Sequence, residues 1–341
     1  MKNDTIPLSK AVEFWEGKFS AIPCIDWLQI DSHGPFQNST FLKTNKLDYK
    51  APNWNEIYEL FKDEWRQATV VSKPTADFIS KDTNLFKLEN RECYWQKPVS
   101  RLIQIAESCN TKFYQPSRID LAIDFNTFHN GYLPNTFISD YFLCKIVNKR
   151  NSGFTTIGNQ SFNLSFDYLR FSKKKSRVSV YLYNKSKELR EVKMKNYIVK
   201  HWKDNGLDIN KDIWRLEFSI HLPKFDFIDL LSGEVEQFNC INLDNKDYLH
   251  KIIKILLQRY FTFVYKTNSE LKNCKKEVKL FSNITGSYKL NFRDCCQDNG
   301  RSDRIFLHKL KDLNNELRRN AKHLAPYGDM ITNYYKKSRL L

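Results

Sequence analysis

Three short stretches of the chain alternate strictly between apolar and polar residues, the pattern of β-strands with one buried face and one open face. They are Ser117–Phe125 (SRIDLAIDF), Arg177–Lys185 (RVSVYLYNK) and Trp214–Ile220 (WRLEFSI). If the three strands pair in one sheet, their apolar sides line a core and their polar sides share the opposite face. That face then carries aspartates, a glutamate, tyrosines and cations, the residue types of a metal-assisted phosphodiester site with a tyrosine nucleophile.

Segments around these strands predict helices and further strands. Periodic apolar residues predict helices over Asn55–Thr69, Asn245–Tyr265 and Asp303–His323. A long basic helix is expected over Asn184–Asn205, with Ser186 as its N-cap and Gly206 where it should stop. This order of elements favours an α+β fold, with an antiparallel sheet that carries the site, helices on one face, and a basic, mostly helical C-terminal module. We expect an N-terminal α+β part over 1–115, a catalytic core over 116–235 and the C-terminal module over 236–341.

The formal net charge of +16 is unevenly distributed. Acidic and basic residues balance in residues 1–115, so the whole surplus of basic residues lies beyond them. Such a surplus fits a polyanion partner, because each neutralised phosphate releases counterions. A solubilising surface would produce the same surplus, so charge alone does not identify the partner.

Cysteine and histidine spacing excludes several kinds of site. The eight cysteines form no C-x-x-C pair, and the seven histidines form no His-hydrophobic-His pair. Free thiols in a reducing cytoplasm explain the cysteines. Any metal must then be held by carboxylates, which favours Mg²⁺ or Mn²⁺. The longest apolar stretch, Ile252–Val264, is too short and too charged to span a bilayer, so we expect a cytoplasmic protein without a membrane partner.

Asp120, Asp124 and Glu217 are the candidate metal ligands, because all three lie on the predicted polar face. Asp120 and Asp124 are four residues apart on one strand, and therefore roughly 13 Å apart. They cannot share one ion unless the strand bends, so Glu217 is the natural second ligand. The alternative is structural, with Asp120 in an ion pair with Arg118 or Arg215.

A tyrosine nucleophile needs activation, because a free phenol has a pKa of about 10. Tyr183 and Tyr181 share the predicted polar face, and the residues alone do not separate them. Lys185 lies two residues after Tyr183 and Arg215 lies on another predicted strand, so either cation could stabilise a phenolate. Attack on phosphorus would conserve the phosphodiester energy as a phosphotyrosine, so that the strand could be rejoined.

Basic and polar residues near the second strand are candidate DNA contacts. They are Lys173, Lys174, Lys175, Ser176 and Arg177, together with Arg118 on the first strand. Lysines beside a strand can clamp a backbone phosphate, and Ser176 can donate a hydrogen bond to it. A solvated hairpin tip would explain the lysine run equally well.

Four motifs follow one another along the chain. They are R-x-D-x-A-x-D (Arg118–Asp124), Y-L-R-F-S-x-x-x-S (Tyr168–Ser176), Y-L-Y-N-K-x-x-E (Tyr181–Glu188) and W-R-L-E (Trp214–Glu217), preceded by IDWL (Ile25–Leu28). In order and approximate spacing, this set resembles the Rep_trans family of rolling-circle replication initiators and related relaxases, over about residues 20–225. One departure is Phe171, where family members often have a glycine.

The resemblance implies a site-specific DNA nickase and ligase, with Tyr183 as nucleophile because it falls in the family's Y-[DN]-K motif. It places metal binding on Asp120 and Glu217, stabilisation of the phenolate on Lys185 and Arg215, and further acidic candidates at Asp124 and Glu188. Such an enzyme would bind a double-stranded origin, expose a single-stranded nick site, and leave a 5′-phosphotyrosine and a free 3′-OH for a host polymerase. A host helicase and a second copy of the chain are further candidate partners.

Two other functions are compatible with the same residues. The first is a metal-dependent nuclease that activates water with Asp120, Asp124 and Glu217 and needs no tyrosine. The second is a non-catalytic DNA-binding regulator of replication, which would bind DNA without cleaving it.

Overall fold

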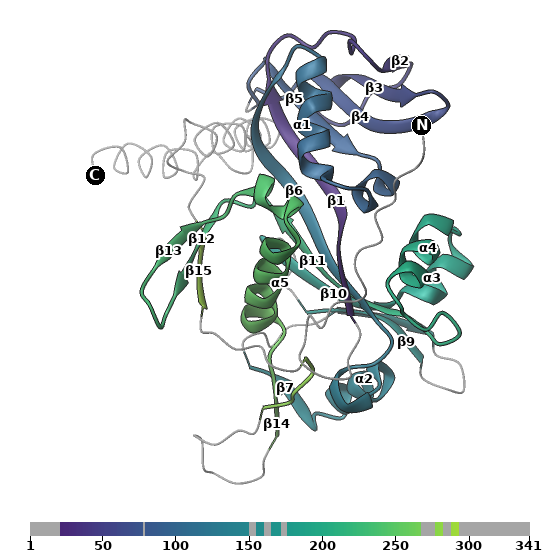
Figure 1. Cartoon of the computed structure of the whole chain (residues 1–341), viewed down its shortest axis with the longest axis vertical. Coiled ribbons are helices and arrows are strands. Elements are labelled where there is room, and N and C mark those ends of the chain that lie inside the picture. Colours follow the sequence, from purple (N-terminus) through teal and green to yellow (C-terminus); the bar gives the residue numbers. More distant parts are fainter. Residues whose placement is uncertain are drawn as a thin grey trace, which may run out of the picture.

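An antiparallel sheet is the central element of the computed structural model, which describes residues 21–77, 79–149, 155–159, 165–171, 176–266, 277–281 and 288–292 (Figure 1). Its ten strands have the order β2-β3-β4-β5-β1-β6-β11-β10-β9-β8. The bounds are β1 Ala21–His33, β2 Lys43–Leu47, β3 Trp54–Lys62, β4 Trp65–Pro74, β5 Thr83–Leu88, β6 Lys112–Phe125, β8 Thr155–Asn159, β9 Ser165–Arg170, β10 Val178–Asn184 and β11 Trp214–His221. The predicted α+β fold is therefore confirmed.

Helices and two small sheets complete the described chain. The helices are α1 Pro98–Ser108, α2 Pro134–Phe142, α3 Lys185–Glu191, α4 Asn196–Asp204 and α5 Lys246–Tyr260, with 3-10 turns η1 Asn90–Tyr94, η2 His129–Gly131 and η3 Cys240–Asp244. The small sheets join β12 Phe225–Asp229, β13 Val235–Gln237 and β15 Tyr288–Phe292, and β7 Ile146–Asn148 with β14 Phe263–Tyr265. Among the helices of these ranges, none has both the length and the apolar content that crossing a bilayer would need.

The three alternating stretches are neighbours in the sheet, as predicted, in the order β6-β11-β10. Their register places Glu217 between Tyr181 and Ala122, and Arg215 between Tyr183 and Asp124. Side chains at paired positions point to the same side of a sheet. All of these polar residues therefore share one face.

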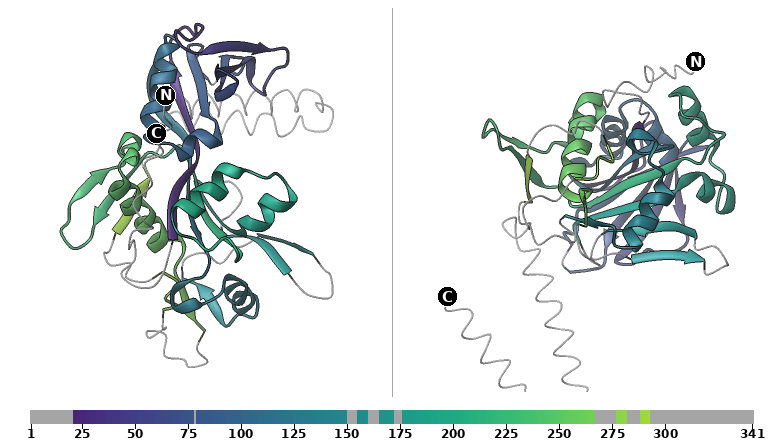
Figure 2. Two further views of the ribbon diagram at one scale, coloured as in Figure 1. Left: turned by 45° about the vertical axis from the view of Figure 1, so that its right-hand side comes forward. Right: turned by 90° about the horizontal axis from the view of Figure 1, so that it is seen from below.

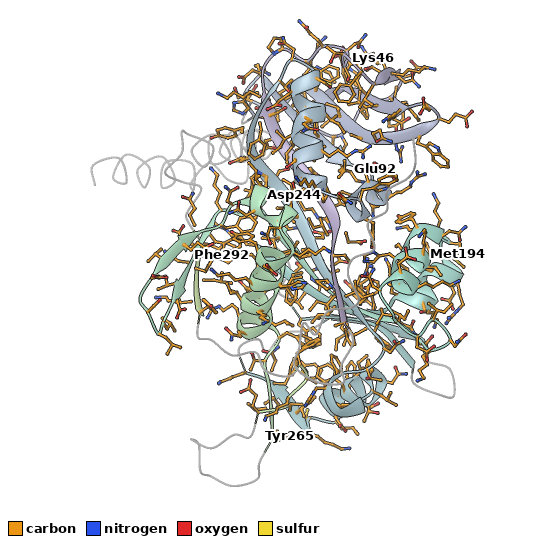
Figure 3. All side chains as sticks on the ribbon, viewed as in Figure 1. Lys46, Glu92, Met194, Asp244, Tyr265 and Phe292 are labelled. Carbon is orange, nitrogen blue, oxygen red and sulfur yellow. The ribbon has the colours of Figure 1, made fainter. Side chains whose placement is uncertain are left out.

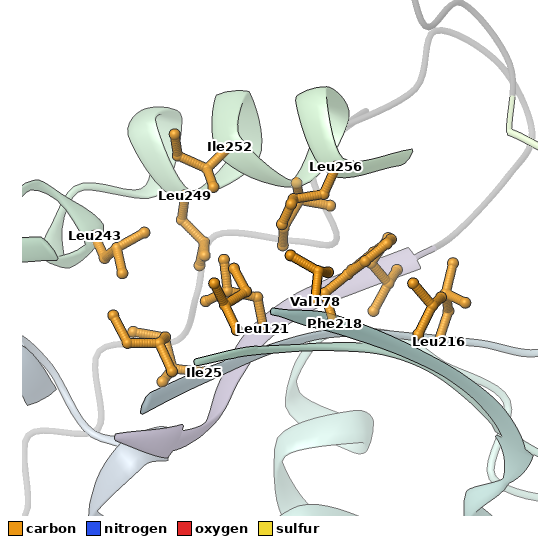
Figure 4. Close-up of a cluster of buried hydrophobic side chains, with 14 of the residues drawn as sticks. Ile25, Leu121, Val178, Leu216, Phe218, Leu243, Leu249, Ile252 and Leu256 are labelled. Atoms are coloured by element: carbon orange, nitrogen blue, oxygen red, sulfur yellow. The ribbon is translucent and has the colours of Figure 1, made fainter. Parts of the chain in front are cut away.

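The opposite, apolar face of these strands is covered by α5 (Figure 4). Leu249, Ile252 and Leu256 of this helix belong to one buried cluster with Leu121 and Phe218 of the sheet. Complete burial of such a side chain stabilises the fold by roughly 1.5–3 kcal/mol. The helix predicted over Asn245–Tyr265 is thus confirmed over Lys246–Tyr260, and Asn245 caps it by accepting a hydrogen bond from the backbone N–H of Asp247.

Phe171 also belongs to this core. Its side chain is fully buried, and its ring lies 5.4 Å from that of Phe261 and 5.5 Å from that of Phe263, both in edge-to-face contact. A glycine at this position would leave a cavity between these rings. The departure from the family pattern therefore has a packing explanation.

Residue 244 connects the segment after β11 to the N-terminal helix. The Asp244 carboxylate accepts hydrogen bonds of 2.9 Å from the backbone N–H groups of Val99 and Ser100, so it caps α1 from η3 (Figure 3). Strands β1 and β6 run from the part of the molecule that carries α1 into the part that carries the other helices (Figure 2). The boundaries near residues 115 and 235 stay predictions; β6 spans the first of them.

The predicted helix over Asn55–Thr69 is wrong, because this segment is the hairpin of β3 and β4. Its turn places Asp63 at a φ of 55°, a conformation that Asp tolerates better than most residues. Both arms are rich in β-branched and aromatic residues, and pairing with β5 adds a third strand. Tertiary pairing thus overrides the helical spacing of Ile57, Leu60 and Phe61.

The predicted helix over Asn184–Asn205 is two helices, α3 and α4, separated after Glu191. The break lets α4 fold back, so that Ile198 and Trp202 pack with Leu189 of α3. Asn184, rather than Ser186, is the N-cap, because its side chain accepts a hydrogen bond from the backbone N–H of Lys187. This helix pair lies on the opposite side of the sheet from α5 (Figure 4), so helices cover parts of both faces.

Candidate active site

Tyr183, at the end of β10, lies on the same side of the sheet as Glu217. Its hydroxyl donates a hydrogen bond of 2.8 Å to Glu217 Oε2, and Lys185 Nζ lies 3.4 Å from the same hydroxyl. Lys185 is buried and also makes an ion pair of 2.6 Å with Glu188. The strand places the phenol and α3 begins with the lysine, so a single segment supplies both groups.

Burial controls the ionisation of this pair. It raises the pKa of Tyr183 well above the usual value for a phenol, and the negative charge of Glu217 acts in the same direction while Arg215 opposes it. Burial also raises the pKa of Glu217 to about 7, aided by the charges of Asp26 and Asp120. In the free protein Tyr183 is therefore protonated, and it is hydrogen-bonded to a carboxylate that can accept a proton near neutral pH.

Arg215 is fully buried beside this pair and is surrounded by acceptors. Its Nε and Nη2 atoms each lie 2.7 Å from an oxygen of Asp124, and its Nη1 atom lies 2.6 Å from Asp26. Nη2 also donates to the Tyr94 hydroxyl at 2.8 Å. The guanidinium thus fixes β1, η1 and β6 relative to β11. It acts on Tyr183 through its charge, and a direct role in stabilising the phenolate stays a prediction.

The predicted metal ligands differ in how they are already bonded. Asp124 is fully buried and accepts hydrogen bonds from Arg215 and from Trp202 Nε1, the latter at 2.7 Å. Asp120 accepts two hydrogen bonds from Arg118, at 2.9 and 2.6 Å, which is the structural ion pair considered as an alternative. Glu217 has no ion-pair partner among the described residues, and Oε2 is its only hydrogen-bonded oxygen there.

Whether these residues suit a divalent ion depends on how many carboxylates the ion needs. Within the described ranges, no three His, Cys, Asp or Glu side chains lie close enough to hold one ion together. Mg²⁺ is commonly bound through only one or two carboxylates plus the phosphates of a substrate. Glu217 fits such a site, because the neighbouring charges of Asp26 and Asp120 that raise its pKa would be relieved by a cation.

Asp26 and Tyr94 are site residues that the sequence reasoning missed. A β-bulge in β1, between Ile25 and Trp27, interrupts the alternation and turns Asp26 toward Arg215. Although burial alone would raise it, Arg215 and Lys185 hold the pKa of Asp26 below its usual value. The signal in the sequence was a charged residue directly after Ile25 in an otherwise buried strand.

The predicted DNA contacts are only partly described. Lys173, Lys174 and Lys175 lie outside the described residues. Ser176 and Arg177 are half-buried just before β10, and Arg177 Cζ lies 5.9 Å from the ring centroid of Phe292. Arg118 faces the same side as the site. The role of each in binding DNA stays a prediction.

Comparison with solved structures finds a likeness in fold. The chain is similar to a rolling circle replication initiator protein from Geobacillus stearothermophilus, with a TM-score of 0.44 and 13% identity over 76% of this chain and 93% of that chain. No protein-family model matches the chain, and no curated protein matches its sequence.

Proposed function

We propose that this protein is a rolling-circle replication initiator that nicks and rejoins origin DNA through Tyr183. The observation that carries the proposal is the hydrogen bond of 2.8 Å from the Tyr183 hydroxyl to Glu217, with Lys185 Nζ 3.4 Å from the same oxygen. A phenol, a base and a cation are the three groups that a tyrosine transesterase requires. The four ordered motifs and the basic surplus beyond residue 115 agree with a DNA substrate.

In the forward step, Tyr183 Oη forms a bond to the phosphorus of the scissile phosphodiester, and the bond from phosphorus to the 3′ oxygen breaks. The phenolic proton passes to Glu217, and the leaving 3′ oxygen takes a proton from water to become a free 3′-OH. The product is a 5′-phosphotyrosine. Attack by a 3′-OH on this adduct reverses the step and rejoins the strand, with Glu217 returning the proton to Tyr183.

The other charged groups assist this step. Lys185 lowers the cost of the developing phenolate, since its ammonium group is already beside the hydroxyl. A Mg²⁺ or Mn²⁺ ion, when bound by Glu217 and the scissile phosphate, would polarise that phosphate. Arg215 and Asp124 would keep β11 and β6 in register beneath the reacting groups.

Nicking of supercoiled origin plasmid in the presence of Mn²⁺ tests the assignment. We expect Tyr183→Phe to abolish both nicking and the covalent protein–DNA adduct, because the nucleophilic oxygen is removed. Tyr181→Phe is the matched control, since Tyr181 lies on the same strand and face, and it should retain both.

Nicking and adduct formation by Tyr183→Phe would refute the proposal. Metal-dependent cleavage that never yields an adduct, even with the unaltered protein, would instead favour the nuclease that activates water. Specific DNA binding without cleavage under any divalent metal would favour the regulator.

A further inference from the structure

Trp27 lies half-buried on the sheet face that carries Tyr183, and a cation contacts its ring from each neighbouring strand. Lys87 Nζ on β5 lies 3.5 Å from the ring centroid, and Arg118 Cζ on β6 lies 4.5 Å from it. Trp27 is the register partner of Asp120, which fixes its side of the sheet. Two cations are thus held against one indole at the border of the candidate active site, by cation–π contacts.

Lys87 has no acidic partner in this cluster. Among the described residues, it makes no ion pair and no side-chain hydrogen bond, although its side chain is half-buried. Burial lowers its pKa; the charge of Glu89 opposes this shift, and those of Arg66 and Arg118 add to it. An ammonium group in such a place would be stabilised by an anion in direct contact with it, which none of the described residues supplies.

Arg118 is already paired, but it adds to the local surplus of positive charge. Its Nε and Nη2 atoms bind Asp120, which leaves Lys87, Arg118 and Asp120 together with one more positive than negative charge. The indole orders both cations before any ligand arrives, which reduces the entropy that binding would otherwise cost. The arrangement suits a single phosphate diester, which carries one negative charge.

A second group of aromatic and basic residues lies on the same face, on β9 and β10. The rings of Tyr168 and Tyr181 lie 5.6 Å apart, and Arg170 Cζ lies 5.6 Å from the ring centroid of Tyr181. Aromatic rings beside cations suit unpaired bases and their backbone better than duplex DNA, whose bases are stacked inside. Glu217, on β11, lies between the two groups.

We propose that Lys87 and Arg118, ordered by Trp27, form a phosphate clamp for single-stranded DNA on one side of the phosphate that Tyr183 attacks. Tyr183 lies three strands away from Trp27 across the sheet and four residues further along the strand direction. The two residues are therefore roughly 20 Å apart. The clamp therefore holds the strand several nucleotides from the reacting phosphate. This inference rests on the proposed function in one respect, namely that the scissile phosphate lies next to Tyr183.

Binding of a fluorescent oligo(dT) twenty nucleotides long, followed by anisotropy over a range of salt concentrations, tests the clamp without requiring the origin sequence. Removing one phosphate contact to a single strand should reduce the slope of log K against log salt by about 0.7. We therefore expect Lys87→Gln to lower the slope by that amount and to weaken binding about fourfold at 0.15 M salt. Lys87→Arg keeps the charge and should keep the slope.

Two further variants separate the clamp from a general loss of charge or of folding. Lys46→Gln removes the same charge from edge strand β2, where Lys46 is exposed and paired with Glu56, and should leave the slope unchanged. Trp27→Phe keeps a ring for both cations and should bind normally, whereas Trp27→Ala should lose as much as Lys87→Gln. Thermal unfolding identifies any variant that fails to fold.

An unchanged slope in Lys87→Gln, or an equal change in Lys46→Gln, would overturn the clamp. These outcomes are independent of the nicking assay. Clamp-dependent binding without a Tyr183 adduct would leave the clamp standing and remove the proposed function. Adduct formation together with an unchanged slope in Lys87→Gln would support the proposed function and remove the clamp.

Discussion

At the scale of single residues, the site depends on how neighbouring charges are distributed among a few carboxylates. Asp124 and Asp120 are each neutralised by an arginine, so neither has an unmet charge. Glu217 has no cation of its own among the described residues, and its pKa rises to about 7 because of burial and of the negative charges of Asp26 and Asp120. Glu217, which lacks an arginine partner, is thus the carboxylate best able to accept a proton.

The raised pKa of Glu217 predicts a change of stability with pH. The folded protein holds this proton up to about pH 7, whereas the unfolded chain releases it near 4.5. The unfolded state therefore binds fewer protons in this interval, so stability falls as the pH rises from about 4.5 to about 7.

Glu217→Gln should remove this dependence. Thermal unfolding of both proteins in EDTA, at a series of pH values, measures it. Identical pH profiles of stability for the two proteins would show that Glu217 titrates normally.

The buried Arg215 predicts a large loss of stability for a substitution that keeps its charge. Lysine cannot reach Asp124 with two nitrogens and Asp26 with a third, so Arg215→Lys would leave a buried carboxylate without its counterion. Breaking such a buried pair costs about 3–5 kcal/mol. Urea unfolding measures the loss. Arg190→Ala is the control: its ion pair with Asp212 is exposed, and exposed pairs contribute about 0–1 kcal/mol.

At the scale of elements, strict alternation over seven to nine residues identified β10, β11 and the second part of β6, and the face of the side chains there, although Lys185 begins α3 instead of ending the strand. The same reasoning failed at β3 and β4, because Ile57, Leu60 and Phe61 fit a helical spacing and the decisive contacts come from a distant strand, β5. It also missed Asp26, since a bulge shifts the face of a residue by one position and leaves little trace in the pattern. Local periodicity therefore predicts a strand better than it predicts what pairs with that strand.

The packing of α5 on the apolar face should contribute much of the free energy of unfolding. Leu256 is fully buried against the sheet, so Leu256→Ala removes its contacts and leaves a cavity, which costs about 2–5 kcal/mol. Leu231→Ala is the matched control, because Leu231 is 83% exposed in the turn after β12 and should change stability by less than about 0.5 kcal/mol. Urea unfolding compares the two. Equal losses would mean that α5 does not pack as described.

At the scale of the whole molecule, the sheet separates stability from chemistry. One face is filled by α5 and the aromatic core, while the other carries α3 and α4 at one end and the polar groups of Tyr183, Glu217 and Trp27 elsewhere. The sequence predicted this division because alternation assigns each side chain to a face. It did not predict that helices would also occupy the polar face, because that depends on the break after Glu191, which brings Trp202 to Asp124.

The contacts of Arg215 have a practical consequence for dissecting the protein. Its counterion Asp26 comes from near the start of the described chain, and Tyr94 comes from a turn before α1. A fragment that begins at residue 116 would retain the motifs around Tyr183. It would, however, leave the buried guanidinium of Arg215 with only one of its two neutralising carboxylates. Such a fragment should be recovered as aggregate, and adding the missing first third of the chain as a separate peptide should restore its solubility.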